Sequence, residues 1–157
     1  MASSLTPEEF NETWRIRPDT FALRMSGGDW QRYEHVKYIG RKVQETIFKG
    51  GRLIVEMPPR HGKSELISFW TPIWYLSLFP KKRVLLATYE YEFACHWGKR
   101  CRNEIIHNSR VDQVTIPRDS QAAGRWETSQ GGGMFVAGAG GPITGRGGDL
   151  LIIDDIV

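Results

Sequence analysis

The sequence of 157 residues predicts an α/β fold in which a mainly parallel sheet is flanked by helices. Short apolar strand patterns alternate along the chain with longer helical patterns, which is typical of such sheets. A β-branched run at residues 53–55 leads through a loop into an apolar helical pattern. A second apolar run, at residues 150–153, ends in two aspartates. Because a run without polar residues is typical of a strand buried on both faces, we expect the second strand at the centre of the sheet.

The loop after residues 53–55 carries a phosphate-binding motif of the P-loop kind. Gly62, Lys63 and Ser64 stand where the helix begins, and N–H groups at a helix start lack intrahelical partners and favour an anion. We expect Lys63 to bind the β- and γ-phosphates of ATP and the Ser64 hydroxyl to ligate Mg²⁺. The usual first glycine of the motif is Met57 here, so two prolines must shape the loop. The predicted ATP-binding residues are Pro59, Arg60, His61, Gly62, Lys63, Ser64 and Glu65.

Asp154 and Asp155 complete the predicted site, because an apolar strand that ends in a carboxylate is the Walker B pattern. The carboxyl ends of parallel strands lie at the edge of the sheet that the P-loop occupies. We therefore expect Asp154 to hold Mg²⁺ through water, and Asp155 to orient or deprotonate the attacking water. The two motifs together predict ATP hydrolysis, with ATP and Mg²⁺ as the ligands.

The other elements follow from periodicity and turn residues. Gly50 and Gly51 end one helix, and Pro72 predicts a kink near Phe69 in the helix after the P-loop. Residues 1–28 are interpreted as an N-terminal arm and residues 29–157 as the ATPase domain. We expect helices at residues 6–16, 30–48, 63–78 and 93–107, a strand at 84–88, and a hairpin of strands at 125–128 and 134–137.

Some polar residues allow two interpretations. Gln31, Tyr33 and His35 could contact the nucleotide base, although a packed or solvated helix face is the favoured interpretation. The net charge of +3 permits a nucleic-acid partner without requiring one. A solvated face is likewise favoured over DNA contact for three basic residues of the helix at 93–107, namely Lys99, Arg100 and Arg102.

Bulk properties exclude some classes. The first ten residues are polar and acidic, so no signal peptide is expected, and no apolar run reaches the roughly 18 residues of a membrane span. We therefore expect a cytoplasmic protein without a membrane partner.

The motifs together resemble the large terminase subunit of tailed bacteriophages, the motor that packages viral double-stranded DNA. The resemblance covers roughly residues 30–157. It implies an additional-strand, RecA-like P-loop ATPase that works in the host cytoplasm at the procapsid portal, with the portal protein and the small terminase subunit as partners. It also implies a homo-oligomeric ring, a pentamer in the working motor. The segments that carry it are residues 57–65, 87–89, 141–147 and 151–155.

The family's pattern also implies roles for arginines. Arg60 in the P-loop could sense or brace the γ-phosphate, and Arg146 is the first candidate for an arginine that reaches the ATP of a neighbouring subunit. Arg125 is the second candidate. Many relatives have Asp-Glu where this chain has Asp154 and Asp155, so the attacking water must lie closer or another acid must activate it.

Family members continue with a coupling motif, further strands and an RNase-H-like nuclease domain. We therefore expect this chain to represent the N-terminal ATPase part, incomplete after the Walker B strand, and to have no nuclease activity. One alternative is a helicase-like P-loop ATPase of another kind. Another is a nucleotide-binding or assembly module that does not turn over ATP on its own.

Overall fold

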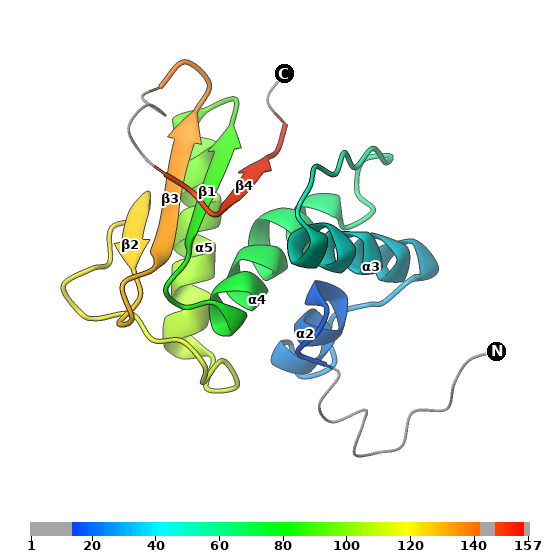
Figure 1. Ribbon diagram of the computed structural model, residues 1–157, viewed down its shortest axis with the longest axis horizontal. Helices are drawn as coiled ribbons and strands as arrows, with labels where there is room; N and C mark the ends of the chain where they lie inside the picture. Colours follow the sequence, from blue (N-terminus) through cyan, green and yellow to red (C-terminus); the bar gives the residue numbers. More distant parts are fainter. Residues whose placement is uncertain (1–13, 142–146, 156–157) are drawn as a thin grey trace.

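The computed structural model describes residues 14–141 and 147–155 of the chain (Figure 1). The predicted helix at residues 6–16 therefore lies almost entirely outside the described residues. The elements in chain order are α2 (Pro18–Met25), α3 (Glu34–Lys49), the π-helix η1 (Glu65–Trp70), α4 (Thr71–Leu78), β1 (Arg83–Thr88), α5 (Tyr91–His107), β2 (Arg125–Glu127), β3 (Gly133–Gly138) and β4 (Leu150–Ile153).

The strands form one four-stranded sheet in the order β2-β3-β1-β4. β1 pairs in parallel with both β3 and β4, with Leu86 opposite Val136 on one side and Ile152 on the other. β2 pairs antiparallel with β3, so the predicted hairpin is confirmed. The expected α/β class with a mainly parallel sheet is thus confirmed for the described part of the chain.

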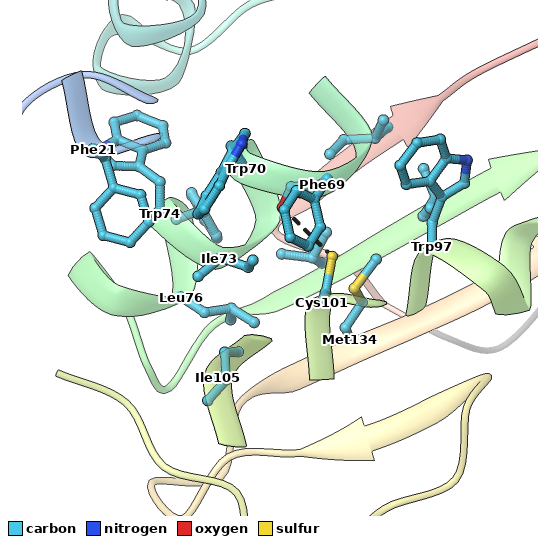
Figure 2. Packing of buried hydrophobic residues seen from close by; sticks show 14 of the residues in the cluster. Phe21, Phe69, Trp70, Ile73, Trp74, Leu76, Trp97, Cys101, Ile105 and Met134 are labelled. Carbon is cyan, nitrogen blue, oxygen red and sulfur yellow. Dashed lines mark hydrogen bonds between the residues drawn. The ribbon is translucent and has the colours of Figure 1, made fainter. Parts of the chain in front are cut away.

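The core lies between one face of the sheet and the helices η1, α4 and α5. Side chains alternate between the faces of a strand, so Val84, Leu86, Met134, Val136 and Ile152 share the face that enters the core. α5 crosses behind the sheet in Figure 1. Figure 2 shows the aromatic and aliphatic side chains of the helices that meet these strand residues, and each fully buried one contributes roughly 1.5–3 kcal/mol.

The helix after the P-loop is irregular where the sequence predicts a kink. Residues 65–70 form a π-helix, and both the backbone N–H and the hydroxyl of Thr71 donate to the carbonyl of Leu66, five residues earlier. Pro72 has no N–H to donate to the carbonyl of Ser68. The Cys101 thiol lies 3.5 Å from the carbonyl oxygens of Ser68 and Phe69 and donates weakly to them instead. Figure 2 draws the hydrogen bond to Phe69.

Two strand predictions are wrong. Residues 53–55 form no strand, because they have no neighbouring strand to pair with, and an isolated extended segment has no ladder to hold it. β4 lies at the edge of the described sheet and not at its centre, and Leu151 and Ile153 are 56% and 57% exposed. A cavity of about 810 Å³ separates β4 from residues 50–55, and the side chains of Ile54 and Val55 line its far side.

The first two helices join the same core. α2 buries Phe21, Ala22 and Met25. It begins at Pro18, just after the predicted end of the helix at residues 6–16. Proline is favoured at a first helical position because its missing N–H would have no partner there. α3 begins at Glu34, four residues later than predicted. Within the described residues no helix is long and apolar enough to cross a membrane.

Candidate nucleotide-binding site

The P-loop bends sharply before the helix. Gly62 has φ +85° and Arg60 has φ +63°, both in the left-handed region, which glycine adopts readily and arginine does not. The carbonyl of Gly62 accepts the first helical hydrogen bond, from Leu66 N–H at 3.0 Å. The backbone N–H groups of the first turn therefore point out of the helix start, an arrangement that suits an anion.

Two histidines hold this bend together. His61 Nδ1 lies 2.8 Å from the Pro59 carbonyl oxygen and 3.2 Å from that of Pro58, so Nδ1 carries the proton and donates. His35 Nε2, at the start of α3, donates to the His61 carbonyl at 2.9 Å. Sequence reasoning assigned His61 to ATP binding, whereas here its side chain shapes the loop. His35 is exposed and stacks on Tyr33, which is also exposed.

Lys63 meets both aspartates, although Asp155 is 92 positions away in the chain. Its Nζ lies 3.4 Å from Asp154 Oδ1 and 3.3 Å from Asp155 Oδ1. The aspartates sit just beyond β4, where Asp154 N–H donates to the carbonyl of Ala87 and the carbonyl of Asp155 accepts from Tyr89 N–H. The structure thus brings the two predicted motifs together at the carboxyl ends of β1 and β4.

The charges at this point favour a protonated lysine. Partial burial lowers the pKa of Lys63, but the nearby carboxylates of Asp154 and Asp155 raise it, and the net shift is upward. The Lys63 ammonium therefore faces the carboxylates of Asp154 and Asp155, and the three side chains together carry a net charge of about −1. Asp155 has a φ of +45° and a side chain that is 61% exposed, so its carboxylate reaches solvent, whereas that of Asp154 is 4% exposed.

Ser68 is a site residue that the sequence interpretation missed. Its hydroxyl donates to Asp154 Oδ2 at 2.7 Å, and neither side chain reaches solvent to any extent. The available signal was a serine within the apolar run of residues 66–70, four residues after Ser64.

Glu65, expected among the ATP-binding residues, pairs with α5. Its carboxylate accepts two hydrogen bonds from Arg100, at 2.7 and 3.0 Å, and the Arg100 guanidinium lies over the rings of Phe69 and Trp97 at 4.4 and 5.0 Å. The hydrogen bonds to Glu65 raise the pKa of Arg100 further. Arg100 is therefore partly covered, with 35% of its side chain exposed, and not on a fully solvated face as expected. Arg102 is also engaged, with Asn103 and the carbonyl of Gln121.

The donor chemistry fits Mg²⁺ delivered with a nucleotide. No group of three His, Cys, Asp or Glu residues in segments 14–141 and 147–155 could hold a metal by itself. Mg²⁺ is commonly bound by one or two carboxylates together with substrate phosphates, and needs no such group. Ser64, directly after Lys63, and Asp154 supply a hydroxyl and a carboxylate for this purpose.

The remaining predicted residues are Pro59 and three arginines. Pro59 and Arg60 are exposed on the loop. Arg146 lies outside the described residues. Arg125 begins β2, at the edge of the sheet opposite β4, and stacks on Phe135, so it cannot serve the ATP site of its own subunit.

No family model, curated protein or solved structure matches this chain in the comparisons with known proteins.

Proposed function

We propose that this chain is the ATPase part of a large terminase subunit, which hydrolyses ATP to drive double-stranded DNA into a procapsid. The observation that carries the proposal is the contact of Lys63 with Asp154 and Asp155 at the carboxyl ends of two parallel strands. A P-loop lysine beside a strand-terminal aspartate is an arrangement that P-loop NTPases use for phosphoryl transfer. The motif resemblance supplies the terminase assignment.

Each residue has a distinct role in this proposal. Lys63 exchanges its carboxylate partners for the β- and γ-phosphates of ATP, which it neutralises as charge develops. Ser64 and Asp154 would hold Mg²⁺, which would supply charge neutralisation at the phosphates. Asp155, with its exposed carboxylate, orients the attacking water.

Arginines provide further positive charge. Arg60 extends from the loop with an exposed side chain, where it can brace the γ-phosphate. Arg146 from a neighbouring subunit is proposed to complete the site in trans. On this proposal the subunits form a ring, a pentamer in the working motor, on the portal protein in the host cytoplasm, with the small terminase subunit and double-stranded DNA as further partners.

A second candidate is nucleotide binding or assembly without turnover by this chain alone. The observation that favours it is the missing strand at residues 53–55, because the segment that leads into the P-loop is not anchored in the sheet. A loop held on one side only is less well organised for the transition state than one held on both.

ATP hydrolysis by the chain and by Lys63→Ala, together with nucleotide titrations in Mg²⁺, tests these functions. We expect Mg²⁺-dependent binding and turnover that Lys63→Ala reduces by at least a hundredfold, whereas Lys99→Ala on α5 leaves both unchanged. Binding without turnover would favour the second candidate. Absence of nucleotide binding by the wild-type chain would contradict the ATPase proposal and the nucleotide-binding form of the second candidate.

A further inference from the structure

Ser68 occupies an unusual place, buried behind the strand-end aspartate. The residues around it in the helix, Leu66, Phe69 and Trp70, are buried and apolar. A hydroxyl placed among such residues costs free energy unless it finds a partner, and here the partner is the carboxylate of Asp154 at 2.7 Å. A hydrogen bond to a charged group is shorter and stronger than one between neutral groups.

The two oxygens of Asp154 have different partners. Oδ2 accepts from Ser68 in the interior, and Oδ1 faces the Lys63 ammonium at 3.4 Å. When Lys63 turns to a phosphate, Oδ1 loses its partner but Oδ2 keeps the Ser68 hydroxyl. The carboxylate then presents a single oxygen, in a fixed orientation, to the cation that accompanies the nucleotide.

The backbone around Ser68 also makes hydrogen bonds of its own. Its carbonyl lies 3.5 Å from the Cys101 thiol of α5. The Thr71 hydroxyl and N–H close the π-turn on Leu66. Such turns recur at functional sites, where they displace side chains from the regular helical register.

We propose that Ser68 is a positioning residue that fixes the Asp154 carboxylate for Mg²⁺, an inference that rests on the proposed ATPase function. Because Ser68 is buried, on this proposal it acts through Asp154 and makes no contact with the nucleotide. Its loss should therefore weaken the metal-dependent part of nucleotide binding and leave the metal-free part unchanged.

The test titrates a fluorescent ATP analogue into wild-type chain, Ser68→Ala and Ser68→Thr, in EDTA and at a series of Mg²⁺ concentrations. The control is Ser77→Ala on α4, whose hydroxyl donates only to the nearby carbonyl of Trp74. We expect Ser68→Ala to raise the Mg²⁺ concentration for half-maximal binding about tenfold. A change of this size corresponds to the loss of one hydrogen bond to a charged group. Affinity in EDTA should stay within about twofold, and Ser68→Thr, which keeps the hydroxyl, should restore most of the Mg²⁺ response.

Unfolding in urea gives a second measurement that does not require nucleotide. Ser68→Ala, Asp154→Ala and the double variant form a cycle, and the two single effects should not add, because each removes the same contact. Ser68→Cys, close to serine in size but a weak donor, replaces Ser68→Ala if that variant fails to fold.

The outcomes separate the inference from the proposed function. An Mg²⁺ response of Ser68→Ala equal to that of Ser77→Ala, or additive effects in the unfolding cycle, would overturn the positioning role while wild-type binding persists. Absence of Mg²⁺-dependent nucleotide binding by the wild-type chain would overturn the proposed function, and the positioning role with it.

Discussion

Asp19 shows how single residues hold α3 beside the P-loop. Its carboxylate is inaccessible to solvent and accepts hydrogen bonds from Arg17 at 2.8 and 2.9 Å and from Arg32 at 2.9 Å. Arg17 also donates to the carbonyl of Lys37 in α3 at 2.7 Å. A buried charge is tolerated only when it is paired and fully hydrogen-bonded, and two guanidinium groups meet that need. The pairs connect α2 and the following loop to α3, which carries His35.

Gly40 is the α3 residue that lets Asp19 approach. A Cβ at this position would lie 2.6 Å from Asp19 Cγ and closer still to Oδ1. We predict that Gly40→Ala lowers the free energy of unfolding by about 1–3 kcal/mol, because the added methyl overpacks the site and displaces a paired carboxylate. Urea denaturation measures the change. Gly147→Ala, with open space around its Cβ and no left-handed φ, is the matched control and should change stability by under about 0.5 kcal/mol. Equal effects of the two substitutions would contradict the argument.

At the scale of elements, Glu65 and Arg100 connect η1 to α5. Both side chains are about two-fifths exposed, so solvent screening limits their charge interaction. The bidentate geometry and the two aromatic rings around the guanidinium stabilise the pair further. The link begins directly after Ser64, so it fixes the first turn of the helix that presents the P-loop lysine.

We predict that Arg100→Lys destabilises the chain by about 1 kcal/mol even though it preserves the charge, because lysine has neither the fork nor the planar face. Glu65→Gln should cost a similar amount. The comparison is Lys37→Met, which removes the exposed pair with Glu34 on α3 and should leave stability almost unchanged. Urea unfolding of the three variants measures these differences. If Arg100→Lys proved as stable as the wild-type chain, the bidentate geometry and the ring contacts of Arg100 would contribute nothing measurable to the free energy of unfolding.

The elements also show what local sequence can predict. The helix at 93–107 and the strand at 84–88 agree with α5 and β1 to within two residues, because periodicity and turn residues act locally. The irregularity near Phe69 was predicted from Pro72. Residues 53–55 were predicted wrongly because a strand is stabilised by its neighbours, and β-branched composition cannot show whether a neighbour exists.

The residues of the candidate site also fall into two groups, those that local motifs predict and those that only tertiary contacts reveal. Lys63, Asp154 and Asp155 were predictable because each belongs to a short motif with its own chemistry. Ser68 and Arg100 were not, because their roles depend on which element folds against the P-loop helix. A serine in an apolar helix and an arginine on a polar face have many ordinary explanations, and only the tertiary contacts select among them.

At the scale of the molecule, apolar side chains are exposed where β4 ends the described sheet. Leu151 and Ile153 are more than half exposed, and Ile54 across the cavity is 85% exposed. Ile152, between the first two, is 6% exposed because alternation turns it toward the helices. An uncovered edge strand with apolar neighbours is prone to associate with other chains.

We predict that Ile153→Lys reduces aggregation and the fluorescence of a bound apolar dye, with an unchanged far-UV circular dichroism spectrum, because it replaces exposed apolar area with charge. Ile152→Lys, one residue earlier on the buried face, should instead destabilise the fold by several kcal/mol, because a lysine there would be buried without a partner. Light scattering and dye titration measure the first effect, and thermal unfolding measures the second. Both substitutions introduce a lysine into β4 at neighbouring positions, and they differ only in the face of the strand that carries it. Similar behaviour of the two variants would mean that both faces of β4 are covered in solution, and the apolar edge would then not be a free surface of the molecule.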